Sequence, residues 1–162
     1  MMDTYSLQRL QATLITPESF QPYGQVISAS EDGKPFDDRD AQLQIQNGIP
    51  RFYIMRLPDR GRKFHHITRH KLCTQCLGSL NGKDWLMAVA IGVNDHPELE
   101  SLKAFRIPGN CFIKLNVGTW HAGPHFDASA LEFYNLELSD TNISDHETCD
   151  LLETYHVEYE II

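Results

Sequence analysis

Short strand-like segments separated by turn residues run along most of the chain, and this pattern restricts the possible folds more than any other feature. The segments, which alternate in polarity or are rich in β-branched and aromatic residues, lie at 25–28, 43–46, 51–57, 64–80, 85–93, 111–118 and 131–138. Gly, Pro and Asn separate them, and no long amphipathic helix interrupts them. The sequence therefore predicts an all-β fold, a sandwich or barrel with little helix, in a single domain over 1–162.

Four local patterns predict how the segments are built and connected. An Asn-Gly turn between 43–46 and 51–57 predicts a hairpin. The run 64–80 fits a period of two, which predicts one long strand, and the β-branched and aromatic tail 151–162 also favours a strand. A short helix is predicted near 16–19, where a Thr precedes Pro and Glu as an N-cap residue does.

The chain is acidic, with a formal net charge of −8 at pH 7, and this argues against nucleic acid as a partner. No apolar run is long enough to cross a bilayer, and the N-terminal segment lacks a hydrophobic signal core. We therefore expect a cytoplasmic protein with no membrane partner. Reduced thiols are expected there, and Cys73 and Cys76 are interpreted as small buried hydrophobes instead of a redox or zinc pair.

Two separated segments resemble the two motifs of cupins, which are small jelly-roll β-barrels with a site in the barrel mouth. The first resemblance rests on the spacing of Thr68, His70, Gln75 and Gly82. The second rests on the spacing of Asn116, Gly118, His121 and His125. The resemblance implies a cupin-type jelly-roll β-barrel with His70 and His121 in its mouth. A Gly-Pro step between His121 and His125 excludes one continuous helix and predicts a bend.

Five further histidines lie outside these motifs. His65 and His66 are adjacent, and because neighbouring residues of a strand face opposite sides, they are interpreted as a surface pair. The histidines in polar surroundings, expected to be solvent-exposed, are His96, His146 and His156. Chemistry is therefore expected at the motif histidines, whose imidazoles titrate near neutral pH.

The chain as a whole resembles the ureidoglycolate lyase family, also called ureidoglycolate hydrolase, whose members are RmlC-like cupins. The pieces that carry the resemblance lie at 15–27, 47–51, 69–75, 104–105 and 120–121. Two pieces, 118–125 and 134–142, are similar to a branch of the family seen in photosynthetic organisms. The chain departs from the family pattern with Thr68 in place of Glu, Lys71 in place of Pro, and Trp-His-Ala-Gly-Pro in place of Trp-His-His-Pro.

This resemblance implies an enzyme that cleaves ureidoglycolate into glyoxylate and urea in allantoin and purine nitrogen catabolism. Cleavage needs a base for the hydroxyl proton, a proton for the departing nitrogen and a cation for the carboxylate. His121 and His70 are the candidate catalytic residues. Arg69 is the weaker cation candidate, since on strand parity it faces away from His70. The candidate substrate-binding residues are Gln75, Arg51, Lys114, Trp120 and His125.

Such a cleavage requires no redox cofactor, although His70, Gln75 and His121 could together hold a divalent metal. The expected partner is a small acid such as ureidoglycolate or glyoxylate, and the tendency of cupins to pair implies a homodimer. Two other interpretations stay open. The protein could act on another small hydroxy or keto acid, which is consistent with the altered motif at Thr68, or it could bind such an acid as a non-catalytic sensor.

Overall fold

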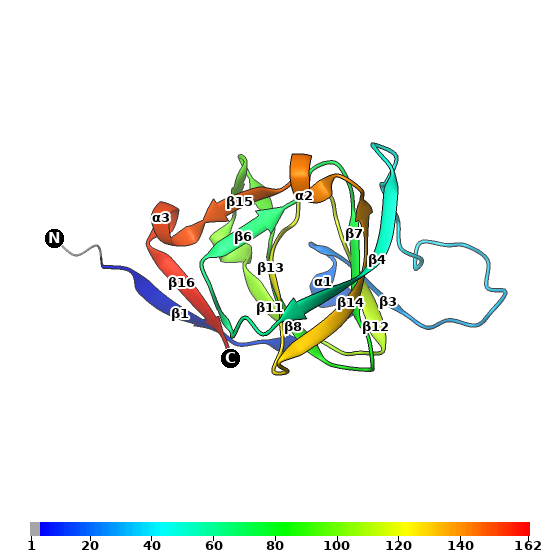
Figure 1. Ribbon diagram of the computed structural model, residues 1–162, viewed down its shortest axis with the longest axis horizontal. Coiled ribbons are helices and arrows are strands. Elements are labelled where there is room, and N and C mark those ends of the chain that lie inside the picture. The colour runs from blue at the N-terminus through cyan, green and yellow to red at the C-terminus, as the bar shows by residue number, and fades with distance from the viewer. Residues whose placement is uncertain (1–3) are drawn as a thin grey trace.

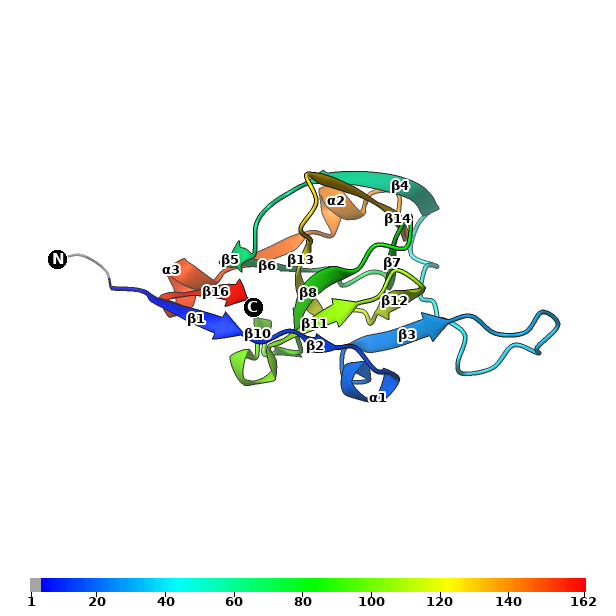
Figure 2. The ribbon, with the colours of Figure 1, turned by 90° about the horizontal axis from the view of Figure 1, so that it is seen from below.

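Two β-sheets face each other across an apolar core, and a smaller sheet lies beside them (Figures 1 and 2). The computed structural model describes residues 4–162. The five-stranded sheet has the order β3 (Gly24–Ser28), β12 (Cys111–Leu115), β7 (Gln75–Ser79), β14 (Ala130–Leu138), β4 (Pro50–Pro58). The six-stranded sheet has the order β15 (Glu147–Asp150), β6 (His66–Arg69), β13 (Trp120–His125), β8 (Trp85–Ala90), β11 (Lys103–Ile107), β2 (Thr13–Leu14).

The remaining elements are short. A three-stranded sheet pairs early and late segments of the chain in the order β1 (Ser6–Leu10), β16 (Val157–Ile161), β5 (Lys63–Phe64). A two-stranded ribbon is formed by β9 (Gly92–Val93) and β10 (His96–Pro97). Within residues 4–162, helix is confined to α1 (Pro17–Phe20), α2 (Thr141–Ser144), α3 (Leu151–Tyr155) and the 3-10 turn η1 (Leu99–Ser101).

Strand β8 shows how the sequence pattern builds the core. Every residue of β8 is buried, because its two faces meet two different apolar clusters. Trp85, Met87 and Val89 join the cluster between the two large sheets. Leu86 and Ala88 join a second cluster between the six-stranded and three-stranded sheets. A strand covered on both faces is a continuous apolar run instead of an alternating one, as the sequence has it.

The predicted all-β, cupin-type fold with little helix is confirmed. The two large sheets face each other without joining into one closed barrel over the part of the chain that the structure describes. The short helix predicted near 16–19 is also confirmed as α1. Its N-cap is Thr16, whose Oγ1 accepts a hydrogen bond of 3.1 Å from the backbone N–H of Ser19, and Pro17 begins the helix.

The predicted hairpin between 43–46 and 51–57 is wrong. Segment 43–46 is not a strand, and β4 pairs over its whole length with the distant β14. The backbone N–H of Gln44 donates to Thr74 Oγ1 and its carbonyl oxygen accepts from the backbone N–H of Thr74, both at 3.0 Å. Two hydrogen bonds therefore fix the segment to the loop before β7. The Asn-Gly turn does not form a hairpin, because β4 pairs with the distant β14 instead.

The prediction of one long strand over 64–80 is also wrong, because the chain changes sheet within it. β6 belongs to the six-stranded sheet and β7 to the five-stranded sheet. The buried Asp145 carboxylate stabilises the break, accepting hydrogen bonds of 2.8 Å from the backbone N–H groups of Lys71 and Leu72. A period of two in the sequence cannot reveal such a break, since both pieces are strands.

The tail prediction is only half correct. Residues 157–161 form β16, but the preceding residues form helix α3. Asp150 is the N-cap, and its side chain accepts from the backbone N–H groups of Leu152 and Glu153. His156 ends the helix in the left-handed conformation with φ of 56°. A five-residue helix is too short to show the helical period in its sequence.

The cysteine interpretation agrees with the structure. Cys73 and Cys76 are buried free thiols, and burial raises the pKa of Cys76 to about 12. A thiol with this pKa stays protonated at neutral pH and is a poor nucleophile. Among residues 4–162, no helix has the length and apolar character needed to cross a membrane.

The close approach of β3 and β12 gives a test of the fold. A Cβ at Gly24 would lie 1.8 Å from the carbonyl oxygen of Lys114, so Gly24→Ala must push the two strands apart. We expect a loss on the order of 2 kcal/mol in the free energy of unfolding, measured by urea denaturation. Gly48→Ala is the matched control, because its Cβ would meet its nearest atom at 3.4 Å. Equal denaturation midpoints for the two variants would contradict the described packing of β3.

Candidate functional site

A cavity of about 290 Å³ lies between the two large sheets, at the end where β7 begins and β14 ends. The polar side chains from the six-stranded sheet and the loop after β6 are His121 and His70. The polar side chains from the five-stranded sheet are Tyr53, Gln75, Asn135 and Glu137. One wall therefore offers imidazoles, and the facing wall offers amide, phenol and carboxylate groups.

The two imidazoles are fixed by backbone carbonyl groups. His70 Nδ1 lies 2.7 Å from the carbonyl oxygen of Asp145, and His121 Nδ1 lies 3.3 Å from that of Thr119. A carbonyl oxygen only accepts, so each Nδ1 donates a proton and each Nε2 keeps a lone pair. The ring centroids of His70 and His121 are 5.2 Å apart. The pair can therefore present two proton acceptors to one small molecule.

Burial keeps His121 neutral. Desolvation, with smaller contributions from the charges of His70 and His146, lowers the pKa of His121 from 6.5 to about 3. His146 completes a row of three rings, with its centroid 5.7 Å from that of His70. At neutral pH the cavity therefore holds an uncharged imidazole whose charged form is strongly disfavoured, as long as no anion is bound.

The facing wall is a closed ring of hydrogen bonds. Gln75 Nε2 donates to Asn135 Oδ1 at 3.1 Å and to Glu137 Oε2 at 3.2 Å. Asn135 Nδ2 donates to the Tyr53 hydroxyl at 3.1 Å, and that hydroxyl donates to Glu137 Oε1 at 3.2 Å. Burial, then the negative charge of Glu137, raises the pKa of Tyr53. Each donor has one defined direction, so the ring is rigid.

The ring leaves acceptors without donors. Gln75 Oε1 is buried and has no hydrogen-bond partner. Glu137 is 1% exposed, and both of its partners in the ring, Tyr53 and Gln75, are neutral donors. Buried acceptors of this kind are costly unless a ligand or water supplies N–H or O–H groups. This wall is therefore suited to a ligand that is rich in donors, such as an amide.

The structure brings together three of the residues selected from the sequence and separates the others from the cavity. His70, Gln75 and His121 all line it. Arg51 does not line it, but it lies across β4 and β14 from Glu137, with its Cζ 3.6 Å from the ring centroid of Tyr53. It is exposed and therefore stands at the rim of the site.

Three other candidates lie on different faces. Lys114 alternates with the core residues of β12, and its Nζ donates to Asn116 Oδ1 at 2.7 Å. Trp120 packs in the second apolar cluster, with the Arg69 guanidinium 4.6 Å from its ring. His125 lies beyond an irregularity in β13 at the Gly-Pro step, where its Nδ1 donates to the carbonyl oxygen of Gly61 at 2.9 Å. Arg69 is buried against Trp120 and pairs with Glu147 and Asp95, so it does not line the cavity.

Several residues of the cavity are not among those predicted from the sequence. Their signal was present in β14, where alternation places Asn135 and Glu137 on the same face as the core residue Phe133. Polar residues in register with a buried face mark a site. Arg60 and His146 also line the cavity, although they come from loop and rim positions that no period selects. His146 is exposed, as predicted, but it is part of the site.

The cavity is not arranged as a preformed metal centre. Among residues 4–162, one group of three His, Cys, Asp or Glu residues has its ligand atoms within 4.8 Å of one another, and it consists of His65, His66 and Asp150. His70 and His121 belong to no such group, and Gln75, the third residue of the predicted metal set, is a weak ligand for transition metals. No step of the chemistry below is therefore assigned to a metal.

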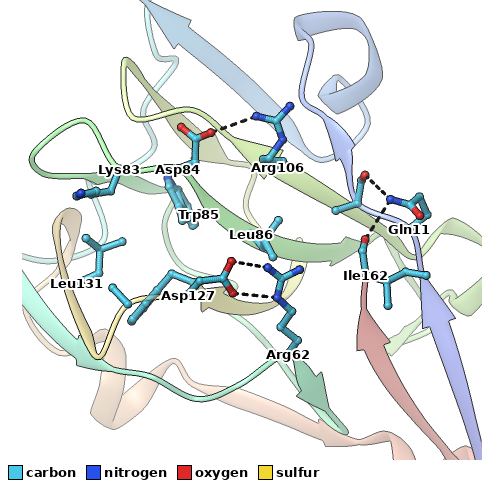
Figure 3. A pocket seen from close by; sticks show the side chains of 13 residues that line it. Gln11, Arg62, Lys83, Asp84, Trp85, Leu86, Arg106, Asp127, Leu131 and Ile162 are labelled. Atoms are coloured by element: carbon cyan, nitrogen blue, oxygen red, sulfur yellow. Dashed lines mark hydrogen bonds and ion pairs between the residues drawn. The ribbon is translucent and has the colours of Figure 1, made fainter.

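A larger cavity of about 470 Å³ lies at the opposite end of the two sheets (Figure 3). Trp85 forms part of its apolar lining, and most of its charged groups are paired. Arg62 binds Asp127 at 2.6 Å, and Arg106 binds Asp84 at 3.1 Å. No histidine is among the described residues that line it. Because two imidazoles face a carboxylate, a phenol and amide groups in the 290 Å³ cavity, we place the candidate chemistry there.

The lowered pKa of His121 predicts a specific pH dependence of stability. The unfolded chain binds a proton at this residue below about pH 6.5, whereas the folded protein does so only near pH 3. The contribution of neutral His121 is therefore complete above pH 6.5 and is lost as the pH falls toward 3, by at most about 1.4 kcal/mol per pH unit. Denaturation of wild type and His121→Gln across this range measures the difference. Parallel curves would show that His121 titrates normally.

Comparison with known proteins shows which family the chain belongs to. A family model described as ureidoglycolate lyase matches residues 34–158. The ureidoglycolate lyases of Escherichia coli O9:H4 (strain HS) and Shigella flexneri are each 26% identical over 132 residues, covering 70% of this chain and 77% of theirs. Among solved structures, a dTDP sugar isomerase from Desulfovibrio desulfuricans G20 matches with a TM-score of 0.47 and 12% identity, covering 78% of this chain and 81% of that one. The family match spans most of the sequence, and this chain therefore belongs to the ureidoglycolate lyase family.

Proposed function

We propose that this protein cleaves ureidoglycolate into glyoxylate and urea, as a step of allantoin and purine nitrogen catabolism. Membership of the family supports the general activity. The observation that carries the proposal is the presence, in one cavity, of two imidazoles and a facing wall with a buried acceptor, Gln75 Oε1, that has no hydrogen-bond partner. Ureidoglycolate carries a hydroxyl to deprotonate and a ureido group to donate N–H bonds.

The proposed proton transfer is balanced within the site. His121 Nε2 accepts the proton of the substrate hydroxyl, and the C–O bond becomes the aldehyde of glyoxylate. The electron pair of the breaking C–N bond passes to the ureido nitrogen, which receives the same proton from His121 and leaves as urea. His70, whose ring centroid lies 5.2 Å from that of His121, is the second proton acceptor near the reacting carbon. No proton is gained or lost overall.

The low pKa of His121 makes the proposed proton transfer selective for an anionic substrate. An empty cavity disfavours the imidazolium because desolvation and the neighbouring histidines oppose it. The carboxylate of the substrate brings a negative charge, which raises the pKa of a nearby imidazole toward its ordinary value. Proton transfer to His121 therefore becomes favourable when the anionic substrate is bound.

The acceptor wall is proposed to hold the ureido group. Gln75 Oε1 has no partner and would accept one N–H of the urea moiety. Each Glu137 oxygen accepts one bond from the ring and retains lone-pair capacity for another. An amide that fills these positions satisfies buried acceptors, and such sites discriminate strongly against analogues that lack the donors.

Two arginines are candidates for binding the substrate carboxylate. Arg60 lines the cavity, whereas Arg51, the residue selected from the sequence, stacks on Tyr53 at the rim. We assign the carboxylate to Arg60, since a guanidinium forms paired hydrogen bonds with a carboxylate. Lys114, Trp120 and His125 receive no role at the reacting centre, because none of them lines the cavity.

A homodimer in the cytoplasm, with no nucleic-acid or membrane partner, is part of the same proposal. Strand β4 is at the edge of the five-stranded sheet and exposes two large apolar side chains, Phe52 at 71% and Ile54 at 61%. Exposed apolar residues on an edge strand favour self-association. Sedimentation of the purified protein at two concentrations distinguishes a dimer from a monomer.

A second function, conversion or binding of another small hydroxy or keto acid, is favoured by one observation. Of the positions that depart from the family pattern, Gly123 and Pro124 line the cavity, whereas Thr68 and Lys71 do not. The altered Gly-Pro step therefore changes the shape of the site itself. Retained glyoxylate binding without cleavage of ureidoglycolate would support this second function.

The first test is glyoxylate release from racemic ureidoglycolate, measured with wild type and His121→Ala. We expect turnover by the wild type and a loss of about 100- to 10,000-fold in the variant, because the proton acceptor is removed. Each is assayed with and without chelator, and loss of activity on chelation would show that a metal participates. No turnover by folded wild type would exclude the lyase activity.

A second prediction separates the two arginines. Arg60→Ala is expected to raise KM for ureidoglycolate at least tenfold, because a charge-assisted contact with the carboxylate is lost. Arg51→Ala is the matched control, since it removes an exposed guanidinium that stacks on Tyr53 and does not line the cavity. A large increase in KM for Arg51→Ala alone would reverse the assignment.

A further inference from the structure

Two histidines and an aspartate meet where β6 pairs with β15, next to the start of α3. His65 Nδ1 lies 3.2 Å from Asp150 Oδ1, and His66 Nε2 lies 3.3 Å from Asp150 Oδ2. The ligand atoms of the three residues all lie within 4.8 Å of one another. In a tetrahedral zinc site with bonds of about 2.0–2.1 Å, neighbouring ligand atoms are roughly 3.3 Å apart, and each imidazole lies at about this separation from one of the two Asp150 oxygens.

The two histidines share one side because the strand is interrupted. Consecutive residues of a regular strand face opposite sides, and on that basis the sequence predicts two divergent imidazoles. Residue 65 instead lies between β5 and β6, and the two ring centroids are only 4.1 Å apart. The carbonyl oxygen of His65 accepts from the backbone N–H of Leu151 at 2.6 Å, which fixes this irregular residue against the start of α3.

The carboxylate is held in place by groups outside the cluster. Asp150 Oδ1 accepts from the backbone N–H groups of Leu152 and Glu153 at 3.0 and 3.1 Å, as the N-cap of α3. Asp150 also pairs with His66 across β15 and β6. Metal ligands are commonly oriented by such outer hydrogen bonds, which restrict the donor atoms before the ion arrives.

A neighbouring cavity of about 230 Å³ is lined by both histidines and by His125. His125 Nδ1 donates to the carbonyl oxygen of Gly61, so its Nε2 is the acceptor, and that nitrogen is buried without a partner. A water bound to an ion at the cluster could supply the missing donor. Arg60 and Lys63 line the same cavity, and their positive charge limits the affinity expected for a cation.

We propose that His65, His66 and Asp150 bind Zn²⁺, with solvent in the fourth position. Two imidazole nitrogens and one carboxylate oxygen suit zinc, whereas calcium and magnesium prefer oxygen ligands only. The side chains are 33%, 57% and 31% exposed, so the ion has an entry path and an open position. The ion would connect β6 to the start of α3, and the site is separate from the imidazoles of the cleavage cavity.

The test is a calorimetric titration of the full-length protein with ZnCl₂, together with the visible spectrum of the Co²⁺-substituted protein. We expect one equivalent of Zn²⁺ to bind at micromolar concentrations and Co²⁺ to give tetrahedral absorption bands. His66→Gln should weaken binding at least tenfold, by loss of a ligand. Asp150→Asn should do the same, since Asn still caps a helix but lacks the charge, so folding is preserved.

Two control variants decide where the ion sits. His96→Gln alters an exposed histidine outside the cluster and should leave Zn²⁺ binding unchanged. His121→Ala alters the cleavage cavity and should also leave it unchanged, whatever its effect on turnover. The proposal is overturned if wild type binds no Zn²⁺ in this range, if His66→Gln and Asp150→Asn bind as tightly as wild type, or if His121→Ala abolishes binding.

Discussion

One buried carboxylate, that of Asp145, holds the site together. Its two oxygens accept the backbone N–H groups of Lys71 and Leu72, where the chain leaves the six-stranded sheet and crosses to the five-stranded one. Its own carbonyl oxygen accepts from His70 Nδ1. The same residue therefore satisfies the backbone at the crossing and sets the tautomer of an imidazole. Because Gln75 begins the next strand, the position of one wall is tied to that of the other.

Much of the fold can be predicted from the sequence because strands and caps are local. Strand-like segments and turn residues identify β8, β12 and β14, and Thr16 identifies the start of α1. The spacing of His70, Gln75 and His121 predicts three residues that the structure does bring to one cavity. The spacing motif predicts these cavity residues correctly because its positions lie near the ends of strands, and strand ends form the mouth of a sandwich.

The parts that sequence reasoning missed depend on contacts between distant segments. The partner of β4 is β14, about eighty residues later, so an intervening Asn-Gly turn carries no information about it. Glu137 enters the site through a strand that looked purely structural, and its neighbours Tyr53 and Gln75 come from two other strands. The side chains of Trp120 and Lys114 lie on sheet faces that point away from the cavity. The chemical character of a residue does not reveal which face it occupies.

The molecule is hollowed at both ends of its paired sheets, and the larger hollow is the one without histidines. Compounds with an aromatic body fit its lining of Trp85 and Phe126 better than the narrow polar end. A screen that scores ligands by thermal stabilisation will therefore collect two unrelated groups of compounds. Under the proposed function, competition with glyoxylate separates the two groups. Inhibitor development that omits this step would optimise binders for the end of the molecule whose cavity has no histidine.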